Sequence, residues 1–369
     1  MNSDPNSDHK STETLASLRE TIDQLDRQLL DLLNQRVEKA GQIGHIKEQN
    51  NAPIYVPPRE EALLQKLSES NHGPLSQASL RCIFREIISA SIAQEKALKV
   101  AYLGPAATFT HQAALKNFGS HPTHEPLDTI QDIFHAVDAG DVDYGVIPIE
   151  NSSEGGVFHS MDMLVDSELS IVAEVYLRIE HCLISGSSLE NIKEVYSKDQ
   201  ALGQCREWLH RYLPRAEWTP CASTAREIDR AADPEKGIAI IASELAAKIH
   251  DVPILKQGIQ DKQDNSTRFL VIGKMPNHDK VGHDQDKTSL LFTINDEPSA
   301  LHHALEPFGR RNINMTRIES RPSRRKAWDY VFFIDIVGHW EEPTIQEAIA
   351  ELKTRCPLVK WLGSYPRAR

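Results

Sequence analysis

The sequence predicts a multidomain fold in three parts: an all-α helical domain, a two-lobed α/β domain, and a small α+β domain of the ferredoxin-like βαββαβ type. Its 369 residues are too many for one ordinary hydrophobic core. The apolar periodicity is helical up to about residue 98, and strands then alternate with helices. A polar stretch, 277–287, precedes the last part. We place the three domains at residues 12–98, 99–276 and 287–369.

Composition limits the classes of partner. The formal net charge of −12 argues against nonspecific binding to nucleic acid and to anionic membranes. The five cysteines are scattered without a CxxC pair, which favours a reducing compartment over disulfides or a zinc site. No apolar run approaches the roughly 20 residues of a membrane span, and residues 1–12 lack the features of a signal peptide. We therefore expect a soluble, cytoplasmic protein with no metal, cofactor, nucleic-acid partner or membrane partner.

The first domain is predicted to contain three helices. Apolar residues recur at spacings of three and four along the first helix, at Leu15, Leu18, Ile22, Leu25, Leu29 and Leu32. Pro53, Pro57 and Pro58 end this helix and open a second over 59–67, and a third runs over 79–98. Three helices with one long member make a poor core for a single chain. We therefore expect two chains to form an intertwined helical dimer.

Two cations lie on the apolar face of the first helix. Continuing its heptad places Arg36 on the apolar seam, where a cation is unfavourable unless a partner neutralises it. Lys47 follows eleven residues later, which puts it on the same face about 16 Å away. That spacing suits the two ends of a small dianion. The third helix adds Ser91 and Glu95 on its apolar stripe, so the alternative is a set of core ion pairs, such as Arg36 with Glu95.

Over residues 15–98 this set resembles the all-helical chorismate mutase family. The resemblance implies a helical dimer and seven substrate-binding residues: Arg19, Arg36, Lys47, Arg59, Glu60, Ser91 and Glu95. Arg19 would cross into the site of the neighbouring chain, and the arginines would handle carboxylates or orientation. Lys47 and Glu95 would donate to the breaking ether oxygen, with Arg36 as the third catalytic residue, and Glu60 would accept from the substrate hydroxyl. The implied reaction is pericyclic, so the protein holds a compact conformer and stabilises developing charge.

Glu95 departs from some relatives, which carry Gln at this position. A carboxyl group can donate a hydrogen bond only when it is protonated. We therefore expect mutase activity to rise toward acid pH, unless burial and the dianion raise the pKa of Glu95.

The second domain is predicted to have a mostly parallel sheet in two lobes with a cleft between them. Five polar runs fall where strands end and helices begin: 104–110 (GPAATFT), 148–156 (PIENSSEGG), 200–205 (QALGQC), 223–225 (STA) and 265–269 (NSTRF). Ligands of open α/β sheets bind at such edges, and helix N-termini favour anions. Thr110, Ser152, Ser153 and Ser223 could instead be helix N-caps.

In order, these runs resemble prephenate dehydratase over about residues 99–275. The resemblance implies decarboxylation coupled to loss of a ring hydroxyl, with Thr267 as the acid or hydrogen-bond donor. Arg268 would pair with a substrate carboxylate or hold the cleft, and a structural salt bridge is its alternative. The implied substrate-binding residues are Thr108, Asn151, Ser152, Thr224, Thr267, Arg268 and Phe269.

The turn at Ala107 and the thiol of Cys205 lead to two further expectations for this domain. The family's first run usually reads GPxGTFS, and here Ala107 and Thr110 replace its Gly and Ser. Because Ala does not readily take a positive φ, we expect this turn to keep φ below zero. Cys205 is expected to be a packed thiol rather than a nucleophile.

The third domain is predicted to have strands over 288–294, 313–320, 328–337 and 358–365, and helices over 299–310 and 344–354. Two loops in it resemble the signatures of the amino-acid-binding ACT domain. They comprise Ser299, Ala300 and Leu301, where Ser replaces Gly, and Glu319, Ser320, Arg321 and Pro322. The resemblance implies that L-phenylalanine binds between two such domains and inhibits the enzyme.

Together, the three resemblances indicate a bifunctional chorismate mutase/prephenate dehydratase with an ACT domain. Its substrates would be chorismate and prephenate, and it would be a homo-oligomer, either a dimer or a tetramer. Three alternatives remain open. They are an enzyme with only one active site, a two-lobed solute-binding protein, and a non-enzymatic amino-acid-sensing regulator.

Overall fold

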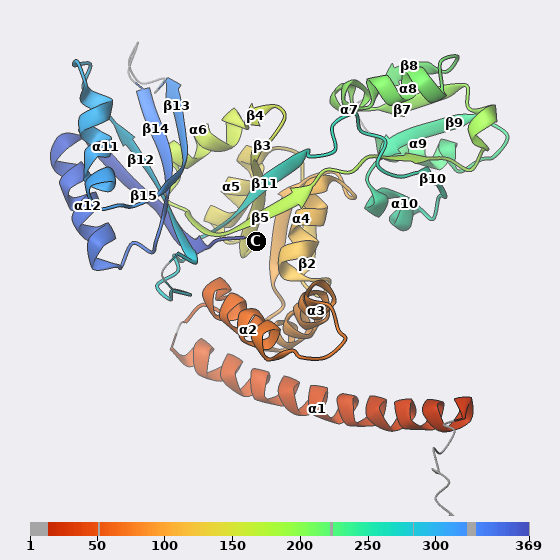
Figure 1. The fold of residues 1–369 in the computed structure, drawn as a ribbon, viewed down its shortest axis with the longest axis horizontal. Coiled ribbons are helices and arrows are strands. Elements are labelled where there is room, and N and C mark those ends of the chain that lie inside the picture. Colours follow the sequence, from red (N-terminus) through yellow and green to blue (C-terminus); the bar gives the residue numbers. More distant parts are fainter. Residues whose placement is uncertain (1–13, 51, 222–223, 283, 323–329, 369) are drawn as a thin grey trace, which may run out of the picture.

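The computed structural model describes residues 14–50, 52–221, 224–282, 284–322 and 330–368. The predictions for residues 1–12, Ser223 and 328–329 lie outside these ranges. Figure 1 shows the arrangement: a helical part lies below, one α/β lobe lies at the centre, a second lobe lies to the right, and a sheet with two helices lies to the left. Among the described residues, no helix is both long enough and apolar enough to cross a membrane.

The helical part consists of α1 (Leu15–Gln49), α2 (Pro57–Ser70) and α3 (Gln77–Glu95). The side chain of Thr14 caps α1, and α2 begins with two prolines, which fit the first turn of a helix. The C-terminal half of α1 packs on α3, and a Cβ atom on Gly44 would lie 2.8 Å from the Cβ of Glu95. This glycine therefore permits the close approach of the two helices.

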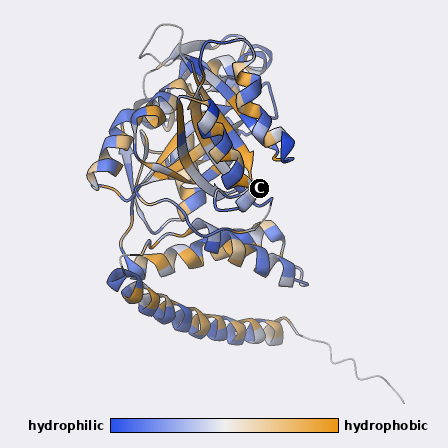
Figure 2. Cartoon of the chain, turned by 90° about the vertical axis from the view of Figure 1, so that its left-hand side faces the viewer, coloured by the Kyte–Doolittle hydropathy of each residue, from blue (hydrophilic) through white to orange (hydrophobic). Residues whose placement is uncertain are grey.

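The N-terminal half of α1 extends away from the rest of the chain (Figure 1). Its apolar stripe is exposed to solvent, with Leu15 67% exposed and Leu32 61% exposed. Figure 2 shows hydrophobic residues recurring between hydrophilic ones along this helix. A single chain therefore does not bury the stripe that the sequence predicted to be a core.

The central lobe is built on a sheet in the order β2-β1-β3-β11-β5, with the short β4 beside β3. Its strands are β1 (Lys99–Leu103), β2 (Thr123–Leu127), β3 (Tyr144–Asn151), β4 (Gly155–Gly156), β5 (Ser170–Arg178) and β11 (Ser266–Gly273), and its helices are α4 (Phe109–Phe118), α5 (Ile130–Ala139) and α6 (Phe158–Asp166). The chain leaves this lobe after β5 and returns through β11.

The second lobe has a sheet in the order β10-β6-β9-β7-β8. Its elements are β6 (Cys182–Ile184), β7 (Glu194–Ser197), α7 (Asp199–Gln204), α8 (Arg206–Tyr212), β8 (Glu217–Pro220), α9 (Thr224–Ala231), β9 (Ile238–Ala242), α10 (Glu244–His250) and β10 (Ile254–Lys256). The prediction of a mostly parallel sheet was wrong, since both sheets are mixed. The strands next to the two connections between the lobes are β5 and β11 in the central lobe and β6 and β10 in the second lobe. Each of them is antiparallel to its neighbours.

The third part has the predicted βαββαβ order, with a sheet in the order β13-β14-β12-β15. Its elements are β12 (Asp286–Thr293), α11 (Ala300–Arg310), β13 (Met315–Pro322), β14 (Tyr330–Val337), α12 (Pro343–Arg355) and β15 (Leu358–Pro366). Both helices pack on one face of the sheet. The other face shares a hydrophobic core with the central lobe, where Leu291, Phe333 and Leu362 join Ile171 and Leu164.

The helical part docks on the central lobe through Tyr55. Its ring lies 4.7 Å from the ring of Phe118 and 5.1 Å from that of Tyr144, measured between centroids. Its hydroxyl accepts a hydrogen bond from Asn117 Nδ2 at 2.7 Å. The helical part is thus attached to the C-terminal end of α4. The N-terminal end of α4 lies at the cleft between the two lobes.

Candidate active sites

A cleft of about 380 Å³ lies between the two α/β lobes. Its walls come from the strand ends and helix starts that the five polar runs marked, and five predicted residues line it: Thr108, Asn151, Thr224, Thr267 and Phe269. The cleft is therefore where the sequence predicted it.

Thr267 and Asn151 form a pair on neighbouring strands. They are directly opposite in the antiparallel register of β11 and β3. Asn151 Nδ2 donates to Thr267 Oγ1 at 2.8 Å and to Asn265 Oδ1 at 2.9 Å. Because the Thr267 oxygen accepts this bond, its own hydroxyl proton is available for donation into the cleft. Thr267 is only 8% exposed, so that donor is largely shielded from water.

A chain of polar side chains continues from this pair, and the sequence reasoning missed most of it. Asn265 Nδ2 donates to Gln204 Oε1 at 3.3 Å, and His181 Nε2 lies 2.8 Å from the same oxygen. An amide oxygen only accepts, so Nε2 is the protonated nitrogen of His181. Burial lowers the pKa of His181, which favours the neutral ring. Gln204 in turn donates to Glu154 Oε1 at 2.8 Å. The QALGQC and PIENSSEGG runs held a signal for Gln204 and Glu154, but His181 lies in no run.

The GPAATFT turn joins the two lobes. The expected negative φ at Ala107 was wrong, because its φ is +66°. The carbonyl of Ala107 accepts a hydrogen bond from Ser243 Oγ of the second lobe at 2.8 Å, and its amide donates to His111 Nδ1 at 3.1 Å. These two bonds hold the residue in the left-handed conformation. Thr108, rather than Thr110, caps α4.

Two predicted residues lie outside the cleft walls. Ser152 Oγ donates to the carbonyl of Asp264 at 3.2 Å and accepts from the amide of Ser266 at 2.9 Å, so it ties two strand ends together. Arg268 is buried on the opposite side of β11 from the cleft, where its Nε lies 2.8 Å from Glu174 Oε2. The expectation of a substrate contact at Arg268 is therefore corrected to its alternative, a structural salt bridge. Cys205 is fully buried, and burial raises its thiol pKa, as expected for a packed thiol.

The helical part brings together five of its seven predicted residues. Lys47 Nζ donates to Glu95 Oε2 at 3.0 Å and to the carbonyl of Ile54 at 2.8 Å. Arg36 donates to Ser91 Oγ and, at 3.4 Å, to the carbonyl of Ile87. Both cations thus face α3, as their shared helix face predicted.

Glu60 completes this group from α2. Its Oε2 lies 2.5 Å from Nη1 of Arg85, a residue that the sequence reasoning missed. Burial raises the pKa of Glu60 to about 7, against the opposing effects of Arg85 and Lys47. The nearby charge of Glu95 also raises it. The sequence did hold a signal for Arg85. It lies one helical turn after Arg81, and the two arginines pair with the adjacent residues Glu60 and Glu61 of α2.

Arg19 and Arg59 are exposed. Arg19 precedes Arg36 by 17 residues on the same helix, which is about 25 Å of helix rise. An arginine side chain cannot reach across that distance, so Arg19 cannot join this group within one chain.

The two predicted effector signatures lie at the start of α11 and on β13. Ser299 precedes α11 with φ +63°, and Leu301 packs on the core beneath the helix. Arg321 Nη2 lies 2.9 Å from Asp162 Oδ1 of the central lobe, and its guanidinium lies 4.1 Å above the ring of Phe158. Ala300 begins the helix, Glu319 Oε2 lies 3.8 Å from Arg317, and Ser320 and Pro322 are exposed.

The fold and these sites define a class of protein: a multidomain protein with a buried charged group in a helical domain, a cleft between two α/β lobes and a ferredoxin-like domain. Family models match in the same order, Chorismate mutase type II over residues 18–96, Prephenate dehydratase over 100–277 and the ACT domain over 288–354. The chain belongs to the bifunctional chorismate mutase/prephenate dehydratase family and is an enzyme with both catalytic domains.

Relatives match along nearly the whole chain. The bifunctional chorismate mutase/prephenate dehydratase of Aquifex aeolicus is 47% identical, covering 96% of this chain and 99% of its own. The Pseudomonas aeruginosa protein of the same name is 42% identical, covering 96% and 98%. A crystal structure of prephenate dehydratase from Arthrobacter aurescens in complex with L-Phe is 33% identical, covers 73% of this chain and 90% of its own, and superimposes with a TM-score of 0.66.

Proposed function

We propose that this enzyme carries out its two reactions at two separate sites. The group around Arg36 and Lys47 would rearrange chorismate to prephenate, and the cleft around Thr267 would convert prephenate to phenylpyruvate. We assign residues 12–98 to the mutase, 99–276 to the dehydratase and 287–369 to the ACT domain. The five cysteines are scattered along the sequence without a CxxC pair, which supports a reducing cytoplasm as the compartment.

The hydrogen bond from Asn151 to Thr267 is the observation that supports the dehydratase site best. In the reaction, the bond from the ring to the carboxylate breaks and carbon dioxide leaves. That electron pair forms a ring double bond, and the ring hydroxyl departs with its own bonding pair. Thr267 would donate its hydroxyl proton toward the departing oxygen in a site shielded from water. Thr108, Asn151, Thr224 and Phe269 would line the substrate.

Substitution of Thr267 tests this assignment. We expect Thr267→Ala to lower dehydratase kcat about 100-fold or more, because a positioned proton donor contributes about that much. Thr267→Ser keeps the hydroxyl and should retain most activity. Mutase activity of both variants, measured with chorismate, should equal that of the wild type. Full dehydratase activity in Thr267→Ala would refute the assignment.

For the mutase, Arg36 and Lys47 would hold the dianion, with Ser91 beside Arg36. Glu95, when protonated, would donate with Lys47 to the ether oxygen, and Glu60 would accept from the substrate hydroxyl. The exposed leucines of α1 support a dimer in which a second copy covers them and supplies Arg19. Arg59, which is exposed at the start of α2, would close the site when substrate binds.

For regulation, L-phenylalanine would bind between two ACT domains at Ser299–Leu301 and Glu319–Pro322. The similarity to a dehydratase crystallised with L-Phe supports this effector. The ion pair of Arg321 with Asp162 offers a direct connection from the signature to the dehydratase lobe. If millimolar phenylalanine changes neither the dehydratase rate nor the sedimentation of the protein, this part of the proposal fails.

A further inference from the structure

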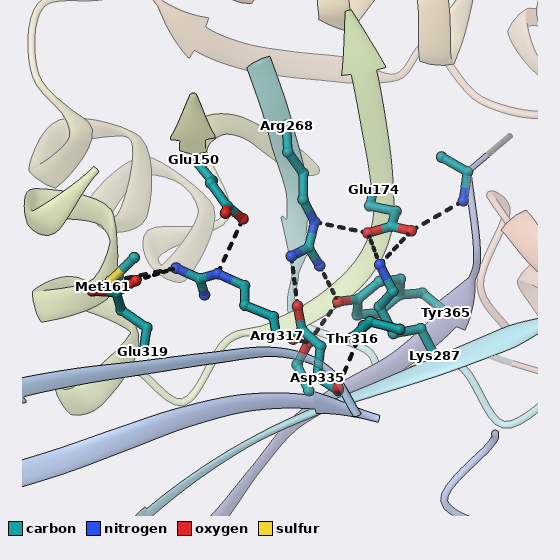
Figure 3. Close-up of polar contacts among 12 residues, drawn as sticks. Glu150, Met161, Glu174, Arg268, Lys287, Thr316, Arg317, Glu319, Asp335 and Tyr365 are labelled. Atoms are coloured by element: carbon teal, nitrogen blue, oxygen red, sulfur yellow. Dashed lines mark hydrogen bonds and ion pairs between the residues drawn. The ribbon is translucent and has the colours of Figure 1, made fainter. Parts of the chain in front are cut away.

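A buried cluster of charged side chains lies between the central lobe and the ACT domain (Figure 3). At its centre is Arg268, which is 4% exposed. Its Nε lies 2.8 Å from Glu174 Oε2 on β5, and its Nη1 lies 2.5 Å from Asp335 Oδ2 on β14. Its Nη2 donates to the hydroxyl of Tyr365 on β15 at 3.0 Å. One guanidinium therefore joins two strands of the ACT domain to the dehydratase sheet.

The cluster is balanced in charge and fully bonded around Arg268. Lys287 Nζ of the ACT domain contacts both carboxylate oxygens of Glu174, at 2.7 Å and 2.9 Å. Ser289 bonds Asp335 and the hydroxyl of Tyr365. Two cations thus face two carboxylates. A buried network in which every member is bonded is rigid, and it fixes the position of each strand that contributes to it.

Arg268 directly follows Thr267 on β11, so the two side chains point to opposite faces of the sheet. Thr267 faces the cleft and Arg268 faces the cluster. Opposite them the register shifts, because Arg268 pairs with Glu150 and Phe269 pairs with Pro148, which leaves Ile149 as an extra residue in β3. A bulge bends the strand and redirects side chains beside it. The direction of the Thr267 hydroxyl therefore depends on how β11 is held at this bulge.

Asn151, the partner of Thr267, has an equivalent attachment. Its neighbour Glu150 lies opposite Arg268 in the register, and Glu150 Oε2 lies 3.1 Å from Nε of Arg317 on β13 (Figure 3). Each member of the Asn151–Thr267 pair thus lies next to a charged residue that the ACT domain binds. Glu150 is beside Asn151, and Arg268 is beside Thr267.

We propose that Arg268 is a positioning residue for the dehydration, which sets the aim of the Thr267 hydroxyl by anchoring β11 to the ACT domain. The proposal rests on the role proposed above for Thr267. It assigns the ACT domain a part in the chemistry in the absence of any effector. An account in which the cluster only attaches the domains predicts no special effect at this position.

Lys360 provides a matched control, because it also joins the ACT domain to the central lobe. Its Nζ donates to the carbonyls of Leu164 and Val165, each at 3.2 Å, at the end of α6. It also donates to the carbonyl of Ser167, and these three acceptors lie at the end of α6 rather than on β3 or β11. Lys360→Met therefore weakens the attachment of the ACT domain at α6.

The test compares three full-length variants with prephenate. Arg268→Met combined with Asp335→Asn removes one charge of each sign, so Glu174 and Lys287 remain paired. Arg268→Lys retains the charge, but one ammonium cannot hold three partners as the planar guanidinium does. Misplacement of a reacting group by about 1 Å can lower a rate about 100-fold. We therefore expect the double variant to lose at least tenfold in dehydratase kcat and Arg268→Lys to lose less, both with KM nearly unchanged because Arg268 does not reach the cleft.

Lys360→Met should retain wild-type dehydratase kcat. Mutase activity in all three variants reports that the helical part is folded, and circular dichroism of each variant reports whether the α/β and ACT parts are. If the double variant does not fold, Arg268→Lys decides alone. Wild-type kcat in the Arg268 variants, or an equal loss in Lys360→Met, would overturn the proposal. Thr267→Ala distinguishes failure of the role proposed for Thr267 from failure of the positioning role proposed for Arg268. If that variant stays active, the proposed role of Thr267 has failed, whereas an inactive Thr267→Ala beside fully active Arg268 variants rejects only the positioning role.

Discussion

At the scale of the residue, Ala107 and Ser299 occupy positions where the resemblance predicted glycine, and both have a positive φ. Both residues thus have a conformation that favours glycine, and at Ala107 two hydrogen bonds hold the residue in it. Sequence reasoning could identify the two positions but not this outcome. It assumed that the turn would adapt to Ala107, whereas the bonds to Ser243 and His111 prevent it from doing so.

Restoring glycine should therefore stabilise the protein. A left-handed conformation costs a residue with a Cβ about 1–2 kcal/mol, part of which the greater freedom of glycine in the unfolded chain offsets. We expect Ala107→Gly and Ser299→Gly each to raise Tm by about 2 °C. The control is Ala106→Gly, whose φ is not positive and which should lower Tm. Scanning calorimetry measures all three, and equal shifts at Ala106 and Ala107 would contradict the explanation.

The pH dependence of the mutase is expected to follow Glu60. Its ionised carboxylate is the strong hydrogen-bond acceptor, and burial raises its pKa to about 7, so this function is lost as the pH falls through that value. We expect mutase kcat/KM to fall below about pH 7 when it is measured between pH 5 and 8.5.

Glu60→Gln should remove this acid fall, because an amide oxygen accepts a hydrogen bond at any pH. Glu95→Gln should leave the fall below about pH 7 in place. A flat profile in the wild type would contradict the role given to Glu60.

At the scale of the element, the long periodic helix α1 could be predicted from the sequence, and strands of only three residues could not. The helix over α1 was predicted because its apolar spacing extends over many turns. Strands β6 and β10 have three residues each, too few to show a period, and they form because the second lobe packs around them. The direction of Arg268 could not be predicted either, since it depends on strands of another domain.

The exposed stripe of α1 leads to a prediction about the mutase. If Arg19 acts in the neighbouring chain, an Arg19→Ala chain paired with an Arg36→Ala chain has one complete site and one site that lacks both arginines. Each variant alone should be inactive. After unfolding and refolding of an equal mixture, half of the dimers are mixed and half of their sites are complete, so about a quarter of wild-type mutase activity should return. No recovery would contradict the shared site.

At the scale of the whole molecule, the three parts are joined through the helix and strands that also carry the proposed dehydratase site. The helical part attaches to the end of α4 through Tyr55 and Asn117, and α4 begins at the cleft with Thr108. The ACT domain shares a core with the central lobe and anchors β11 beside Thr267. The sequence could predict three domains and their order. It could not predict that the ACT sheet forms part of the dehydratase core, because that depends on which face of the sheet the helices leave open.

The central claim is that one chain performs two successive reactions at two independent sites. The most direct measurement follows phenylpyruvate by its absorbance in base after the protein is incubated with chorismate or with prephenate. We predict that the wild type forms phenylpyruvate from both substrates, and that Arg36→Ala forms it from prephenate at the wild-type rate but not from chorismate. Failure of the wild type to form phenylpyruvate from chorismate, or loss of both reactions in a folded Arg36→Ala variant, would contradict the account.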